Sequence, residues 1–156
     1  MPFVILKANS TFKLSGWMIG GFITAQMIGS IFGNIFILKR LTNYKNMLSL
    51  SYLIFIISFT IAYFTESLYG YISIFLLFGI AIDGFKIATM NLVIEISPED
   101  KRPIYTALQT NLSSIGLFFP LIGAYVLENF GYDVLYILTI SILIYALLVI
   151  FKLKRL

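Results

Sequence analysis

The sequence contains no cysteine and no histidine among its 156 residues. Without cysteine the chain can form no disulfide, thiolate nucleophile or thiolate metal site, and without histidine it has no imidazole ligand or imidazole base. Charged residues are also scarce, at 12%, whereas a soluble domain carries about 25%. These shortages exclude most enzyme chemistry, so we expect no catalytic residue, no metal site and no cofactor.

The chain is instead strongly apolar, with 60% hydrophobic residues, 17% aromatic residues and a mean hydropathy of +0.96. A soluble domain needs a more polar surface, so this one is expected to face lipid. At about 20 residues per crossing helix, the length fits five spans. Apolar runs bounded by charge predict them at Leu14–Leu38, Asn46–Thr65, Tyr69–Ile94, Pro103–Leu127 and Val134–Phe151. Runs of this length exclude barrel strands, and the predicted fold class is therefore an all-α, five-span membrane bundle.

The positions of the basic residues predict the orientation of the chain. Eight of the eleven follow the first, third or fifth span: Lys39, Arg40, Lys45, Lys101, Arg102, Lys152, Lys154 and Arg155. The charged residues in the loops after the second and fourth spans are all acidic: Glu66, Glu128 and Asp133. By the positive-inside rule we expect a multi-pass protein of the cell membrane with a cytoplasmic C-terminus. Lys7 and Lys13 lie on the outer side and are exceptions.

The first six residues are apolar and then meet Lys7, a run far too short to cross a membrane. We interpret it as the last turns of a helix whose beginning is absent. The alternative is a short interfacial segment of an intact small protein.

The five spans differ in polarity. The second and fifth offer mainly hydroxyl side chains, which can bond to their own helix backbone, so both can lie against lipid. The first and fourth spans carry polar stripes that predict an internal cavity. The expected cavity-lining residues are Thr24, Gln26, Ser30, Gln109 and Ser113.

Small residues and proline indicate how these polar spans pack. Gly16-x-x-x-Gly20 and Gly29-x-x-x-Gly33 are patterns for close helix approach, although each is a weak signal alone. Pro120 removes a backbone donor and predicts an interruption late in the fourth span.

The third span contains Asp83 and Lys86 near the middle of the predicted crossing. A charge at that depth costs roughly 2.5–3.5 kcal/mol on insertion scales, which few helices tolerate without a partner or a purpose. At positions i and i+3 the two side chains share a face and can pair. The pair is either a buried structural ion pair or a pair that contacts a coupling ion or substrate from an aqueous cavity.

The loop before the fourth span contains signals for a helix start. Ser97 can act as a cap and Pro98 suits the first helical position. The acids that follow, Glu99 and Asp100, are expected in the cytoplasm, where they are structural or part of an inner gate.

Three stretches of this chain are similar to parts of one known family: residues 14–30, residues 97–109, and residues 120–133. Together they resemble helices eight to twelve of the major facilitator superfamily, with the end of helix seven in front. The resemblance implies alternating access, in which two six-helix halves rock about a central site.

That resemblance also implies the partners. They are a small-molecule substrate, a coupling proton or sodium, the lipid bilayer and a missing N-terminal transporter half, with no nucleic acid. The basic loop at Lys39, Arg40 and Lys45 corresponds to a cytoplasmic gating loop of the family. On this interpretation the chain is a truncated or split secondary transporter.

Two other functions compete with the transporter. The first is a small integral membrane protein that binds and stabilises partner helices. The second is an intramembrane hydrolase, which would need two acids at mid-depth where the sequence offers only Asp83. We therefore expect that the protein is not an enzyme.

Overall fold

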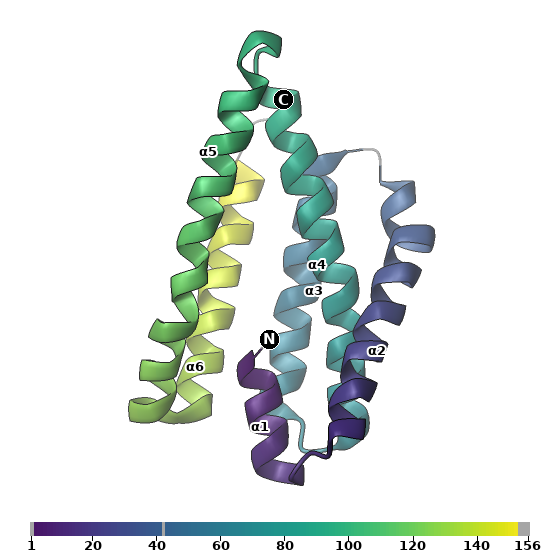
Figure 1. The fold of residues 1–156 in the computed structure, drawn as a ribbon, viewed down its shortest axis with the longest axis vertical. Helices are drawn as coiled ribbons and strands as arrows, with labels where there is room; N and C mark the ends of the chain where they lie inside the picture. The colour runs from purple at the N-terminus through teal and green to yellow at the C-terminus, as the bar shows by residue number, and fades with distance from the viewer. Residues whose placement is uncertain (1, 42, 153–156) are drawn as a thin grey trace.

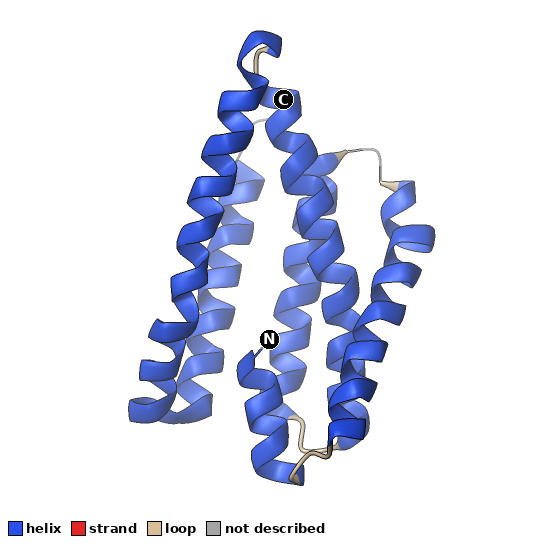
Figure 2. Cartoon of the chain, in the orientation of Figure 1, coloured by secondary structure: helices blue, strands red, loops and turns tan. Residues whose placement is uncertain are grey.

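The computed structural model describes residues 2–41 and 43–152, and within them every regular element is helical (Figure 2). The long helices are α1 (Pro2–Phe12), α2 (Gly16–Phe32), α3 (Tyr44–Phe64), α4 (Leu68–Ile96), α5 (Arg102–Ile115) and α6 (Phe119–Lys152). Shorter turns are η1 (Gly33–Ile37), η2 (Leu38–Arg40), η3 (Glu99–Lys101) and η4 (Gly116–Phe118). The predicted all-α class is confirmed.

Four helical stretches in the described ranges are long and apolar enough to cross a membrane: Gly16–Ile35, Tyr44–Phe64, Leu68–Ile96 and Glu99–Lys152. The fourth contains 54 residues, which at 1.5 Å per residue is far longer than a hydrocarbon core of about 30 Å. Gly131 interrupts it with a non-helical backbone at φ 80° and ψ −179°. Figure 1 shows that the chain turns back at this point, so that two antiparallel limbs lie side by side. We keep the prediction that each limb crosses the membrane.

Pro120 interrupts the first limb of this hairpin as expected. The single 3₁₀ turn η4 (Gly116–Phe118) separates α5 from α6 immediately before it. Gly116 is the residue whose carbonyl would have accepted from position 120 in an uninterrupted α-helix, and proline has no N–H to donate. The prediction of a break there is confirmed.

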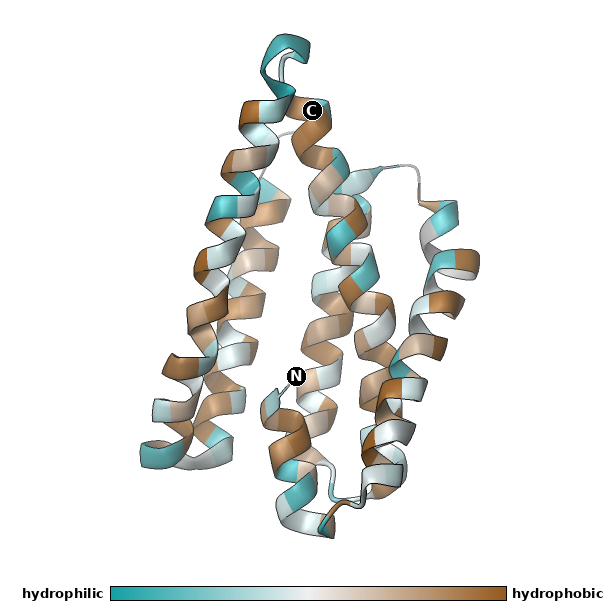
Figure 3. Cartoon of the chain, in the orientation of Figure 1, coloured by the Kyte–Doolittle hydropathy of each residue, from teal (hydrophilic) through white to brown (hydrophobic). Residues whose placement is uncertain are grey.

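The loops segregate by charge at the two ends of the bundle. Figure 1 places the α2–α3 connection, η3 and the end of α6 at one end, and the α1–α2 link, the α3–α4 loop and the turn at Gly131 at the other. Figure 3 shows hydrophilic residues gathered at these ends, with long hydrophobic stretches between them. The basic residues of the α2–α3 connection and of η3 thus lie at one end, opposite Glu66 and Asp133, whereas Lys13 lies in the α1–α2 link at the acidic end; Lys154 and Arg155 are outside the described residues.

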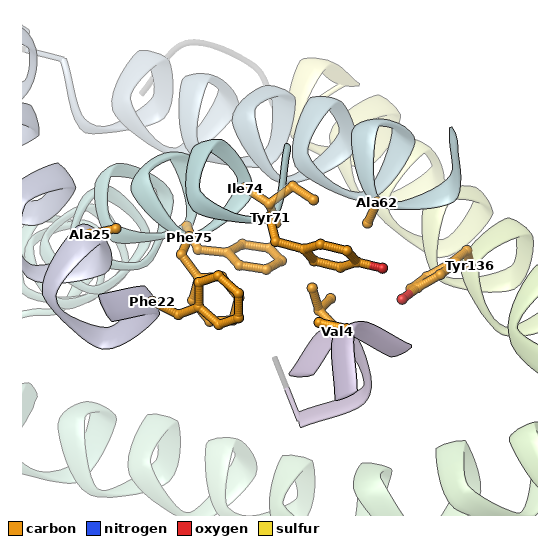
Figure 4. Packing of buried hydrophobic residues seen from close by; sticks show 10 residues of the cluster. Val4, Phe22, Ala25, Ala62, Tyr71, Ile74, Phe75 and Tyr136 are labelled. Carbon is orange, nitrogen blue, oxygen red and sulfur yellow. The ribbon is translucent and has the colours of Figure 1, made fainter. Parts of the chain in front are cut away.

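Helix α4 is the centre of the bundle, because it packs against both α2 and α3, while α3 packs in turn against α6. Tyr71, Ile74 and Phe75 of α4 are fully buried. Phe22 of α2 stacks on Phe75, with ring centroids 4.9 Å apart and planes 5° apart (Figure 4). By contrast, α5 has no buried residue. Helix α5 therefore contributes no buried side chain to the hydrophobic core.

Helix α3 is less exposed than a purely lipid-facing span. Its hydroxyls do bond to their own backbone as expected: Ser51 donates to the Met47 carbonyl at 2.9 Å and Ser58 to the Ile54 carbonyl at 2.7 Å. Both serines are nevertheless buried, and α3 packs against both α4 and α6.

The N-terminal helix α1 is attached to α3 and α6 through one lysine. The Lys7 ammonium donates to the Ala62 carbonyl at 2.7 Å and the Tyr63 carbonyl at 3.1 Å, both in the last turn of α3. It also lies 5.0 Å from the ring centroid of Tyr136 in α6. A helix C-terminus favours a cation. Lys7, which is an exception to the charge asymmetry of the loops, is therefore held by carbonyl groups at the end of α3. The N-terminal segment is helical as predicted.

Candidate functional site

The most polar contact within the bundle is centred on Asp83 of α4. Its Oδ2 accepts a hydrogen bond from the Ser30 hydroxyl and another from Asn34 Nδ2, the latter at 2.8 Å. The donors come from α2 and from η1 at its end, so the contact joins two candidate spans. The carboxylate is half-buried near the middle of α4.

Glycines bring the two helices close enough for this contact. A Cβ atom at Gly29 would overlap the backbone of Leu76, and one at Gly79 would overlap the backbone of Gln26. One at Gly33 would lie only 2.9 Å from the Cγ2 atom of Ile80. The prediction that Gly29-x-x-x-Gly33 mediates close approach is confirmed. The same prediction for Gly16-x-x-x-Gly20 is wrong within the described chain, where nothing lies within 4 Å of either added Cβ.

Asn34 shares the polar face of the first span with Ser30, but it is not among the expected cavity-lining residues. It lies in η1, a π-helical turn over Gly33–Ile37. Such widened turns are rare and often occur at functional sites. The signal that could have revealed it is its spacing of four residues from Ser30, which places both side chains on one helical face.

The ion pair that Asp83 and Lys86 could form is absent among the described residues, so the alternative of a structural ion pair between them is wrong. In the described part of the chain the salt bridge joins Arg102 to Glu99, 3.7 Å apart. The reason is that Asp83 faces α2, where two donors already occupy its Oδ2, while Lys86 is exposed. The two charges thus face different surroundings.

The predicted cavity residues do not converge on one place. Thr24 is exposed and donates to the Gly20 carbonyl of its own helix at 2.9 Å, and Gln26 is half-buried. Ser30 is on Asp83. Gln109 and Ser113 instead line a separate open groove of about 410 Å³ between α4 and α5, together with Val93, Tyr105, Leu108 and Leu112.

The predicted gate residues all lie at the basic end of the bundle. Lys39 and Arg40 are exposed in η2, Lys45 lies in the first turn of α3, and Glu99 and Asp100 are exposed in η3. The structure brings their segments to the same end of the bundle (Figure 1).

The predicted helix start is displaced by one residue: Pro98, and not Ser97, is the N-cap, and the turn η3 that begins at Glu99 leads directly into α5. Ser97 instead closes α4, because its hydroxyl donates to the Val93 carbonyl of that helix. Helix α5 begins at Arg102, with Pro103 in its first turn.

The described residues contain no group of three or more acidic side chains placed to hold a metal ion. The polar groups of the candidate site are the Asp83 carboxylate and its two neutral donors, Ser30 and Asn34. The Lys86 ammonium is separate from them.

The apolar helices, the hairpin and the polar contact between two spans define a multi-pass helical membrane protein. Comparison with protein families matches residues 1–155 to the Major Facilitator Superfamily. The chain therefore belongs to the Major Facilitator Superfamily, a family of membrane transporters and not of enzymes, and the resemblance seen in the sequence is confirmed. Comparisons with curated proteins and with solved structures gave no match.

Proposed function

We propose that this chain is a segment of a secondary active transporter that moves a small solute by alternating access, with Asp83 as the ion-coupling group. The observation that carries the proposal is the contact of Asp83 with Ser30 and Asn34 across two spans. The coupling ion is a proton or sodium, and the partner is an N-terminal half that supplies the opposite wall of the cavity.

A carboxylate at this depth is costly, at roughly 2.5–3.5 kcal/mol on insertion scales. Hydrogen bonds to the charged form favour it, so Ser30 and Asn34 offset part of that cost. When a cation neutralises Asp83, these two donors lose much of their charge-assisted attraction. Ion binding at Asp83 would thereby weaken the attachment of α2 and η1 to α4, which is the kind of linkage that coupled transport requires.

The end of the bundle with the basic loops is proposed to be cytoplasmic, together with the C-terminus. There Lys39, Arg40 and Lys45 on one loop, and Glu99 and Asp100 on another, would act as the inner gate. Their opposite charges on neighbouring loops support contacts that form and break as the halves move.

The proposal can be tested by uptake of a panel of labelled sugars, amino acids and organic acids into cells that express the full-length gene. Under an imposed proton or sodium gradient, at least one solute should accumulate against its own gradient. Asp83→Asn should abolish accumulation and leave exchange of labelled for unlabelled solute, because the charge is lost while the shape is kept.

The matched control is Glu95→Gln, the same chemical change at an exposed acid of the same helix. It should leave accumulation unchanged. Normal accumulation by Asp83→Asn, or no accumulation of any solute, would refute the proposal.

A further inference from the structure

Lys86 is a cation without a described counter-charge. It lies near the middle of α4, it is exposed, and among the described residues its ammonium has no ion-pair or hydrogen-bond partner. An unpaired charge at mid-membrane depth is tolerated when it faces water or meets a charge of opposite sign. The surface that Lys86 faces therefore indicates what it binds.

Lys86 does not itself line the groove between α4 and α5, but helix geometry places it on the same face of α4 as the groove residue Val93. Val93, which lines that groove, follows Lys86 by seven residues, so the two side chains share one face of α4, about 10 Å apart along the axis. Helix α5 runs back from the loop at the end of α4 (Figure 1), and thus its Ser113 lies nearer the depth of Lys86 than its Tyr105 does.

The groove itself combines apolar walls with two neutral polar groups. Val93, Leu108, Leu112 and the ring of Tyr105 supply the apolar surface, and Gln109 and Ser113 supply hydrogen-bonding groups. The groove is open, with a volume of about 410 Å³, and its lining is mostly apolar with a few polar groups, as in small-molecule sites. None of the lining residues is charged.

We propose that this groove and Lys86 form the substrate site, and that the substrate is an amphipathic organic anion. Its negative group binds the Lys86 ammonium, its apolar body lies against Leu108 and Leu112, and Gln109 and Ser113 bond to its neutral polar atoms. The inference rests on the proposed transport function and assigns different roles to the two charged residues of α4. Asp83 faces α2 and takes the coupling ion, while Lys86 faces the groove and takes the substrate.

The test is equilibrium binding to the full-length protein in membrane vesicles without any ion gradient, so that its outcome does not depend on coupled transport. The probes are dansylglycine, which has an aromatic body and a carboxylate, and dansylglycinamide, which differs by having a neutral amide. We expect the protein to bind the anion more tightly than the amide, and both at the same site.

Lys86→Gln should weaken binding of the anion by about tenfold or more, as expected for loss of a charge-assisted hydrogen bond, with little effect on the amide. Lys86→Arg should retain the preference for the anion. Leu108→Ala should weaken both probes because it removes apolar contact, and Lys152→Gln, a change at an exposed lysine that does not line the groove, should weaken neither.

Equal affinity for the two probes in the unaltered protein would overturn the proposal, as would unchanged anion binding in Lys86→Gln. Absence of binding would overturn it as well. In each case Asp83-dependent accumulation of another solute would leave the proposed function standing. Conversely, anion-selective binding that depends on Lys86, without driven uptake, would refute only the coupled transport.

Discussion

Gly79 of α4 lies directly against the backbone carbonyl of Gln26 in α2, so closely that any Cβ at position 79 would overlap it. The neighbouring contact of Gly29 with Leu76 has the same character. These contacts leave the two helix backbones no space for a side chain between them. The hydrogen bonds to Asp83 depend on that close approach.

Replacement of Gly29 by alanine should separate the helices and destabilise the protein by about 1–3 kcal/mol, as overpacking does. Gly20→Ala, in the same helix, meets nothing within 4 Å and should be neutral or slightly stabilising. Thermal unfolding of both variants in detergent measures the difference. Equal midpoints would show that α2 and α4 are not packed through Gly29.

Replacement of Lys7 by methionine keeps an unbranched side chain of similar length and removes the donors to the Ala62 and Tyr63 carbonyls. Loss of charge-assisted hydrogen bonds should reduce stability by about 1–3 kcal/mol. Lys13→Met, at an exposed position, should change it by less than about 0.5 kcal/mol. Denaturation in detergent compares the two, and a larger effect at Lys13 would contradict the assignment of Lys7 as the attachment of α1.

Burial lowers the pKa of Lys7 from its ordinary value of 10.5, while the nearby charges of Asp133 and Glu66 oppose the shift. Because the folded pKa is the lower one, the unfolded state binds more protons in the interval below 10.5, and stability contributed through Lys7 should rise with pH there. The measurement is the stability difference between the unaltered protein and Lys7→Met as pH is raised towards 10.5. A decrease would show that the folded pKa is raised.

Gly131→Ala should destabilise the hairpin by about 1–3 kcal/mol, since φ 80° with ψ −179° is a conformation essentially reserved for glycine. Gly116→Ala is the control: its backbone is right-handed and its nearest new contact is a side-chain atom 3.8 Å away. Limited proteolysis at the turn should accelerate in the first variant only. Similar cleavage of both would mean that the turn tolerates a side chain.

The natural absence of cysteine makes the orientation directly testable. A single cysteine at Asn129, beside the turn at Gly131, should react with an impermeant thiol reagent in intact cells, whereas one at Lys101 in η3 should react only after permeabilisation. The reverse pattern would invert the proposed orientation.

The positions of the long helices could be predicted because lipid imposes both their length and their composition. Tyr44–Phe64 and Leu68–Ile96 each lie within two residues of the expected ends. Asp83 could be selected because a charge in an apolar run stands out without any knowledge of packing. The overall class and the acid of the candidate site are thus local properties of the sequence.

The hydrogen-bond partners of Asp83 could not be predicted from the residues next to it in the sequence. The i, i+3 spacing allowed Lys86 to pair with Asp83, but donors on α2 and η1 bind Asp83 instead. Their approach depends on which glycines face another helix. Gly16 and Gly29 begin the same pattern in the sequence, yet only Gly29 meets a neighbour among the described residues. Likewise, Ser97 has the right chemistry to open a helix, and its hydroxyl closes the preceding one.

The attachment of α1 through Lys7 has a consequence for synthesis. The carbonyls of Ala62 and Tyr63 that receive its ammonium lie 55 and 56 residues later in the chain. At a translation rate of about 5–20 residues per second, the lysine waits roughly 3–11 s for its acceptors to emerge. Throughout that interval α1 lacks this attachment. The hydrogen bonds of Lys7 therefore form only after α3 has left the ribosome.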